Sequence, residues 1–174
     1  MLRQLILCGV GALAMLAGES RAQAQTSASQ TYSVVIPSVM SITAPGGVSI
    51  NHDQTDANQA FPSQGWSAKC NNGLGATVSF STNGPFQASV AGTTYKRNAQ
   101  MNLSVGSAES GSGWATVVSS ATATPDVGVA TVSAASSAPG NATLNLLVTF
   151  IDNHFSLLPA GTFTTTVTAT IAAN

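Results

Sequence analysis

The stretch that decides the fold is LPAGTFTTTVTATIAAN, the seventeen residues from Leu158 to Asn174. Beyond a run of three threonines, Val, Ala and Ile recur at every second position, and no charged residue interrupts them. A period of two is the pattern of a β-strand with one buried face, and β-branched residues suit a pleated surface. The stretch therefore predicts a closing strand that carries Phe163, Val167, Ala169 and Ile171 on one face and the threonines largely on the other.

The same period of two continues through much of the chain. Residues 76–81, 101–105 and 127–132 alternate, whereas residues 143–151 are longer and more apolar, as expected of a central strand buried on both faces. Asn-Gly and Pro-Gly dipeptides mark turns between these stretches. Candidate strands begin near Tyr32, Val39, Val48, Trp66, Ala76, Phe86, Met101, Trp114, Val127, Thr143 and Thr162. Because some of these must merge or fail, the prediction is an all-β fold, an antiparallel immunoglobulin-like β-sandwich of about eight or nine strands.

The N-terminal residues have the pattern of a secretory signal peptide. A short positive start ends at Arg3, residues 5–17 are apolar, and Ala22-Gln23-Ala24 fits the small-x-small cleavage rule. The apolar run is too short to span a bilayer, which argues against the alternative of a membrane anchor. We therefore expect residues 1–24 to be removed, leaving residues 25–174 as one exported β-sandwich domain without a membrane span.

The composition of residues 25–174 excludes some classes of protein. Three basic and five acidic side chains remain, so no basic patch exists that would neutralise the phosphates of a nucleic acid. The chain is 44% hydrophobic, which favours a packed core over disorder. Cys70 is the single cysteine left, so it is either a buried small apolar side chain or a partner for another chain.

Signals of catalysis are weak. The chain has no Gly-x-Ser-x-Gly elbow, no His-Glu-x-x-His motif and no phosphate-binding glycine loop. Its two histidines are His52 and His154. The sequence therefore predicts a protein that is not an enzyme and holds no cofactor. A secreted hydrolase that uses one of these histidines is a further alternative.

One polar loop concentrates oxygen ligands. Asp53, Asp56 and Asn58 lie within six residues, and oxygen-rich loops can hold Ca²⁺. The loop lacks the internal glycine and the terminal glutamate of an EF-hand. The alternative is that these side chains satisfy backbone groups of the loop without any metal.

The closing strand resembles the C-terminal strand of bacterial fimbrial subunits assembled by the chaperone–usher route, and that of the related spore-coat-U-like domains. The family carries a glycine at the place of Gly161, fourteenth from the end, followed by alternating apolar residues. The resemblance implies a periplasmic chaperone as a partner and a route from the periplasm to the extracellular surface. The sequence departs from the family at Ala173, where an aromatic is usual, and in having no partner for Cys70.

The leading hypothesis is a non-enzymatic, secreted structural protein, a pilin-like subunit that self-associates into a surface fibre or coat by β-strand addition. Residues 25–37 would be the N-terminal extension that serves as donor strand, with Tyr32, Val34 and Ile36 as its apolar side chains. Pro37 interrupts the ladder, and the usual small glycine of the donor segment is missing. The alternative is a monomeric carbohydrate- or surface-binding module.

That alternative needs a platform on which a sugar ring can stack. The two tryptophans, Trp66 and Trp114, are the candidates for it, although both also suit a packed core.

Overall fold

A computed structural model describes residues 26–152 and 154–174. The chain divides into two units, Met1–Val35 and Ile36–Asn174, and the second is called the body below. Of the first unit, residues 26–35 are described; they form neither helix nor strand, and they are exposed. The predicted signal peptide, residues 1–24, lies outside the described residues. No helix in the described part of the chain is long and apolar enough to cross a membrane.

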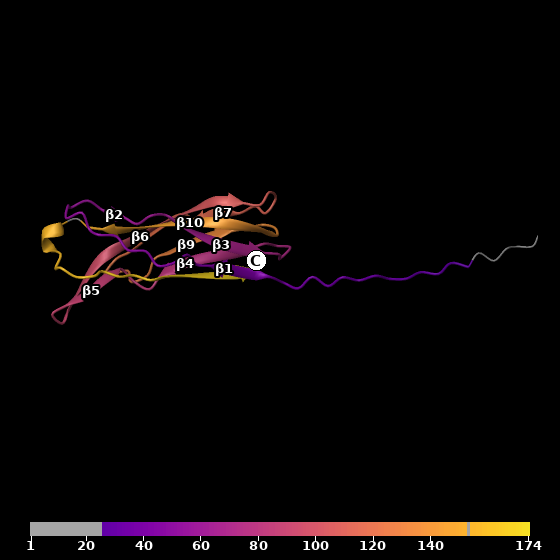
Figure 1. Ribbon diagram of the computed structural model, residues 1–174, viewed down its shortest axis with the longest axis horizontal. Helices are drawn as coiled ribbons and strands as arrows, with labels where there is room; N and C mark the ends of the chain where they lie inside the picture. The colour runs from indigo at the N-terminus through magenta and orange to yellow at the C-terminus, as the bar shows by residue number, and fades with distance from the viewer. Residues whose placement is uncertain (1–25, 153) are drawn as a thin grey trace, which may run out of the picture. The chain divides into compact units, whose positions relative to one another are not determined.

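The body consists of antiparallel strands in two sheets (Figure 1). The larger sheet has the order β1 (Met40–Thr43), β3 (Gln64–Cys70), β10 (Gly140–Ile151), β6 (Thr93–Ala108), β5 (Phe86–Val90), with β2 (Gln59–Ala60) on β10 and β8 (Ser120–Ala123) on β6. The smaller sheet has the order β11 (Val167–Ala173), β4 (Ala76–Thr82), β9 (Thr131–Ala135), β7 (Ala115–Val118). A 3₁₀ turn, η1 (Phe155–Leu157), precedes β11. The all-β, antiparallel prediction is confirmed. The immunoglobulin-like sandwich stays a prediction, because the strands curl into a half-barrel.

Eleven strands form in the described residues, more than the eight or nine predicted. Pro62 separates β2 from β3. Proline interrupts the ladder there because it has no N–H to donate. Only Ser119 lies between β7 and β8, where the chain passes from the smaller sheet to the larger. The strands predicted near Tyr32 and Val48 do not form, since neither segment has a ladder partner.

The apolar core lies between the two sheets. Val78 and Phe80 of β4 are fully buried, as is Met101 of β6, and Trp66 of β3 meets the Phe80 ring edge-on at 5.2 Å. β10 is central, as predicted, between β3 and β6. The predicted burial of both its faces is wrong, because alternate residues such as Asn145 are only half-buried.

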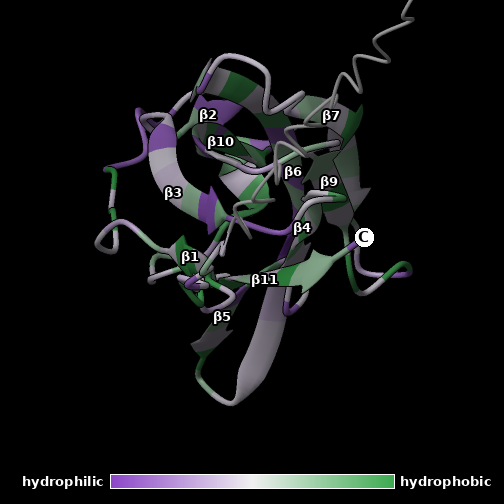
Figure 2. Ribbon diagram, turned by 90° about the vertical axis from the view of Figure 1, so that its right-hand side faces the viewer, coloured by the Kyte–Doolittle hydropathy of each residue, from purple (hydrophilic) through white to green (hydrophobic). Residues whose placement is uncertain are grey.

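The last strand is an edge strand of the smaller sheet. β11 forms a ladder with β4 alone, in unbroken register from Val167 opposite Thr82 to Ala173 opposite Ala76. Its alternate residues Val167, Ala169 and Ile171 are half-buried, whereas Thr168 and Thr170 are exposed, so the predicted faces are confirmed. β1 lies beside β11 without a ladder between them (Figure 2).

Candidate functional site

An apolar groove of about 700 Å³ opens in the body beside the start of β11. Three segments distant in sequence form its walls: residues 48–52, residues 59–64 and residues 158–167. The apolar side chains that line it are Val48, Ile50, Phe61, Phe86, Leu146, Val148, Phe150, Phe155, Leu158, Phe163 and Val167. An open cavity with such a lining is suited to receiving apolar side chains from a partner.

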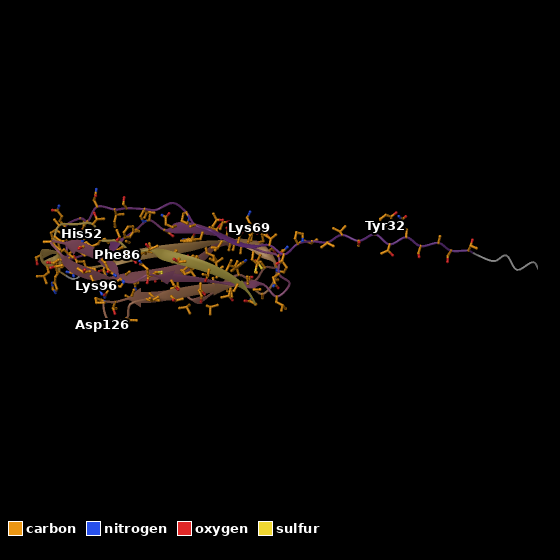
Figure 3. The ribbon with its side chains drawn as sticks, turned by 90° about the horizontal axis from the view of Figure 1, so that it is seen from below. Tyr32, His52, Lys69, Phe86, Lys96 and Asp126 are labelled. Carbon is orange, nitrogen blue, oxygen red and sulfur yellow. The ribbon has the colours of Figure 1, made fainter. Side chains whose placement is uncertain are left out.

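Aromatic rings form one end of this groove. Phe61 stacks on Phe86 with ring centroids 5.7 Å apart, and Phe150 meets both Phe86 at 5.2 Å and Phe163 at 5.5 Å edge-on. Offset and edge-to-face arrangements are the favoured geometries of aromatic pairs, so these rings hold one another in place. In Figure 3, Phe86 and His52 lie at the same end of the body, and Lys69 lies toward the other. The groove is therefore partly preformed.

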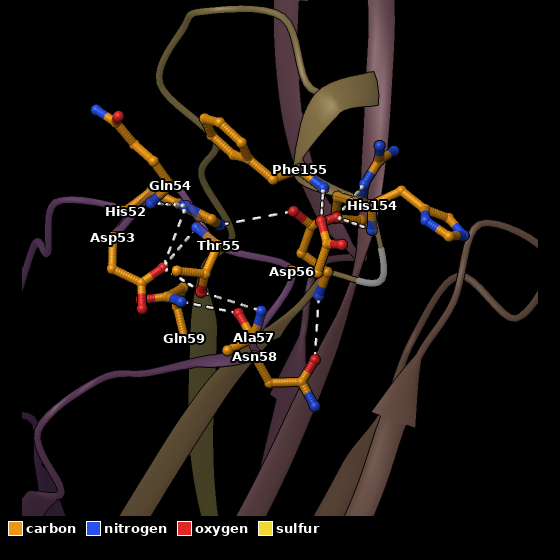
Figure 4. A network of polar contacts seen from close by, with 12 residues as sticks. His52, Asp53, Gln54, Thr55, Asp56, Ala57, Asn58, Gln59, His154 and Phe155 are labelled. Atoms are coloured by element: carbon orange, nitrogen blue, oxygen red, sulfur yellow. Dashed lines mark hydrogen bonds and ion pairs between the residues drawn. The ribbon is translucent and has the colours of Figure 1, made fainter.

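Polar side chains hold the wall that comes before β2, where residues 44–58 have no ladder of their own (Figure 4). The Phe155 N–H donates to Oδ1 of Asp56 at 2.7 Å, and the Asp152 N–H donates to Oδ1 of Asn58 at 3.2 Å. These two bonds join the loop to η1 and to the end of β10. Side-chain hydrogen bonds thus fix this loop, as ladder hydrogen bonds fix the strands elsewhere in the body.

The three residues proposed as calcium ligands all accept hydrogen bonds from the backbone. Besides Asp56 and Asn58, Asp53 accepts at Oδ1 from the Thr55 N–H at 3.0 Å and from the Thr55 hydroxyl at 2.7 Å. The Thr55 hydroxyl, followed by its N–H, holds the pKa of Asp53 below the ordinary 3.8. Among the described residues, no group of three or more His, Cys, Asp or Glu side chains is placed to hold a metal ion. Calcium binding stays a prediction, and loop closure accounts for these side chains as they stand.

A buried carboxylate lies behind the groove. Asp152 is 1% exposed, and its Oδ1 is 3.4 Å from Nε of Arg97, which supplies the opposite charge that a buried carboxylate needs. Nε2 of His52 is 3.6 Å from Oδ2 of the same residue, while the His52 ring stacks on Phe155 at 5.1 Å. His154 is exposed, and its backbone N–H donates to Oδ1 of Asp152. Sequence reasoning named both histidines but did not bring them together with Asp152 and Arg97, because these residues are far apart along the chain.

The residues predicted for the assembly strand divide between the groove and β11. Gly161, Phe163 and Val167 line the groove, and Ala169 and Ile171 continue from it along β11, packed against the core. A Cβ on Gly161 would approach Cγ2 of Val90 to 3.1 Å, so the close packing there favours glycine.

The donor-strand candidates are strongly exposed. Tyr32, Val34 and Ile36 have exposed fractions of 83%, 89% and 79%. Val35 is exposed as well, so the segment carries a run of large apolar side chains that a partner could cover.

The tryptophans offer no exposed platform. Trp114 is buried, with its Nε1–H donating to the Gly140 carbonyl at 3.2 Å, and Trp66 is half-buried against Phe80. Cys70 is buried and free, as expected of a small apolar side chain. Trp114 therefore belongs to the core, and Trp66 packs against it.

Half of the backbone N–H and C=O groups of β11 point away from β4, toward the outer edge of the smaller sheet. The Asn174 N–H donates to the Gly75 carbonyl, and the Asn83 N–H donates to the Thr166 carbonyl. Because antiparallel ladders alternate, the even-numbered residues of β11 bond to β4, and the odd-numbered ones turn their N–H and C=O groups outward. The same residues, Val167, Ala169 and Ile171, turn their side chains toward the core. Free backbone groups and the incompletely covered core thus occur together.

No protein-family model matches the chain. Neither a curated protein nor a solved structure matches it. The function proposed below therefore depends on the groove and on the free margin of β11.

Proposed function

We propose that the chain is a non-enzymatic, exported structural protein, a pilin-like subunit of a bacterial surface fibre or coat assembled by β-strand addition. The observation that carries the proposal is that the apolar groove, lined by Phe163 and Val167, meets the outer edge of β11 where that strand begins. A strand added along β11 would pair with its outward N–H and C=O groups and fill the groove with alternate side chains. We infer that the added strand completes the immunoglobulin-like sandwich predicted from the sequence.

The segment over residues 25–37 has the properties of that added strand. It is uncharged, it carries apolar side chains at Tyr32, Val34 and Ile36, and these are exposed. Extended, its thirteen residues span roughly 40 Å, against roughly 26 Å from Phe163 to Ile171 on the acceptor. The segment is therefore long enough to cover the whole margin.

The strand direction also suits this assembly. β1 begins at the end of the body where β11 finishes, and η1 lies at the opposite end (Figure 1). In a head-to-tail row, the segment before β1 enters the η1 end of the next subunit with its C-terminal residues nearest that entrance. It then runs antiparallel to β11, the arrangement with the more favourable ladder geometry. Before assembly the same margin needs a cover, which the resemblance assigns to a periplasmic chaperone.

Negative-stain microscopy and size-exclusion chromatography of residues 25–174 test the proposal. We expect filaments or large assemblies from the unaltered chain, and a monomer when Tyr32, Val34 and Ile36 are all changed to Ser. The matched control is Val35→Ser, which removes an apolar side chain of similar exposure from the opposite face and leaves assembly intact. A monomeric unaltered chain, or assembly by the triple variant, would contradict the proposal.

The alternative function makes a different prediction. A carbohydrate-binding module would be monomeric and would bind on a glycan array with residues 25–37 deleted. Under the proposed function, that deletion abolishes assembly and leaves a body that binds a synthetic peptide of residues 25–37. The two functions are thus separated by one truncated variant.

A further inference from the structure

We propose that Asn71 keeps the donor segment from folding back onto β1 of its own chain and thereby directs it to a second copy. The inference rests on the proposed function and names the residue that decides between a closed monomer and a polymer. Asn71 follows β3 directly, and its side chain holds the backbone of Pro37 and Val39, just before β1.

Three hydrogen bonds form this clamp. The Val39 N–H donates to Oδ1 of Asn71 at 2.7 Å, and Nδ2 of Asn71 donates to the Pro37 carbonyl at 2.7 Å. The Asn71 N–H donates to the Val39 carbonyl at 3.1 Å. The ladder between β1 and β3 ends where Met40 pairs with Cys70, so the Asn71 side chain extends that ladder along the preceding residues. Pro37 to Val39 are therefore held as a continuation of β1.

Closure within one chain requires these same residues to form a loop. Met40 and Ile42 lie opposite buried residues of β3, so they mark the face of β1 that is turned to the core. The side chains of Val34 and Ile36 must also turn toward the core. Ile36 must then lie opposite Met40, and Val34 opposite Ile42. That register needs a three-residue hairpin loop, Pro37 to Val39. Val39 would then leave Asn71 and give up the bonds at both its N–H and its carbonyl.

A tighter turn is blocked in two ways. A two-residue turn at Pro37 and Ser38 would need the Val39 N–H for the Ile36 carbonyl, and Oδ1 of Asn71 already holds that N–H. It would also place Val35 opposite Met40, which turns Val34 and Ile36 to solvent. Proline followed by serine suits the centre of a reverse turn, so local sequence permits the turn that the clamp prevents.

The test compares Asn71→Ala with Asn72→Ala in the chain of residues 25–174. Asn72 belongs to the same turn; its side chain accepts from the Leu74 N–H at 2.8 Å and makes no hydrogen bond to residues 37–39. We expect Asn71→Ala to raise the ratio of monomer to assembled protein about ten-fold, the change that one to two net hydrogen bonds bring. Light scattering after size-exclusion chromatography measures the ratio, and Asn72→Ala should leave it unchanged.

Amide hydrogen exchange shows whether the monomer is closed. In the Asn71→Ala monomer, residues 26–36 should exchange slowly, because they pair within their own chain. Rapid exchange there, or an unchanged monomer ratio, would overturn the inference. If Asn71→Ala does not fold, Val39→Gly provides the second variant, since glycine enters a hairpin loop readily and leaves Asn71 in place. An unchanged ratio for a folded Val39→Gly would likewise count against the clamp.

The outcome is separable from that of the proposed function. If the truncated body does not bind the peptide of residues 25–37, the proposed function fails, and the inference fails with it. If the peptide binds and the unaltered chain assembles, but Asn71→Ala assembles equally well, only the role of Asn71 is wrong.

Discussion

The two margins of the smaller sheet differ in how they end. β7 has four residues, and its register with β9 shifts between Thr116 and Val118, which is the mark of a bulge. The chain then leaves the sheet, as the Ser119 carbonyl accepts the N–H of Leu103 in the larger sheet at 2.8 Å. β11 has seven residues in unbroken register, with no lysine, proline or bulge. Short, bulged edges resist pairing and long regular ones invite it, so one margin is protected and the other is open.

Composition does not explain this difference. Both strands are uncharged and consist largely of Ala, Thr and Val, and Val117 and Val118 on β7 are even exposed. What separates the strands is their surroundings. All four residues of β7 are exposed, whereas alternate residues of β11 pack against a core that is open at the groove. Strand addition thus requires free backbone groups and also a place for the side chains of the added strand.

The outer edge of β5, in the larger sheet, has a partner where β11 has none in its ladder. Gln87 of β5 and Thr164, just before β11, each donate an N–H to the carbonyl of the other at 2.9 Å. The chain thus covers the outer edge of β5 at Gln87 as it crosses to the smaller sheet. Among the edges of the described sheets, β11 is the long regular one, and the short β1 lies beside it without a ladder.

The largest effect is expected from a pair of proline variants that compares the inner and the outer side of β11. Thr170→Pro removes an N–H that faces β4, so we expect a loss of about 1–3 kcal/mol in the free energy of unfolding from the unpaired Ser79 carbonyl alone. Ala169→Pro removes an N–H that faces outward, so its effect on unfolding should be small, as on any edge. It should, however, weaken binding of the 25–37 peptide about ten-fold.

Urea denaturation and a peptide titration give both quantities. Equal destabilisation by the two prolines would show that the outward N–H of Ala169 is already bonded within the body, and the open-margin description would be wrong.

A pair of lysine variants sharpens the comparison between the two margins. Val118→Lys on β7 should change the free energy of unfolding by no more than about 0.5 kcal/mol and leave assembly intact, since the residue is already exposed. Ile171→Lys on β11 places a charge on the half-buried face and should prevent assembly. Sedimentation velocity of both variants distinguishes them. Loss of assembly in Val118→Lys would mean that β7 is an interface too.

The smallest expected effect concerns the wall of the groove. Thr55→Val removes the hydroxyl that holds the pKa of Asp53 down, so that pKa should rise toward 3.8. Because the folded-state pKa is lowered, the stabilisation exists above the unfolded-state pKa and is lost as pH falls through the folded-state pKa. The pH dependence of stability in that acidic range should therefore flatten in the variant. Carboxyl NMR titration measures the change, and an unmoved Asp53 would show that the backbone N–H alone is responsible.

The sequence by itself determined the elements whose signal is local. Alternation over residues 76–81 and near the C-terminus predicted β4 and β11 and the residues on each face of β11, because side chains of a strand alternate whatever its partners are. The donor-strand role of Tyr32, Val34 and Ile36, chosen by the same spacing, stays a prediction. The burial of Cys70 was the first of two interpretations that a lone cysteine allowed.

The tertiary structure alone decided which strand margins are closed and where the groove lies. The bond from Phe155 to Asp56 joins residues 99 positions apart, and the clamp from Asn71 reaches Pro37 across 34. Alternation says which side of a strand is apolar but not which of its edges has a partner, since that depends on backbone contacts between distant segments. The bulge of β7 and the regular edge of β11 therefore look alike in the sequence and differ only in the folded body.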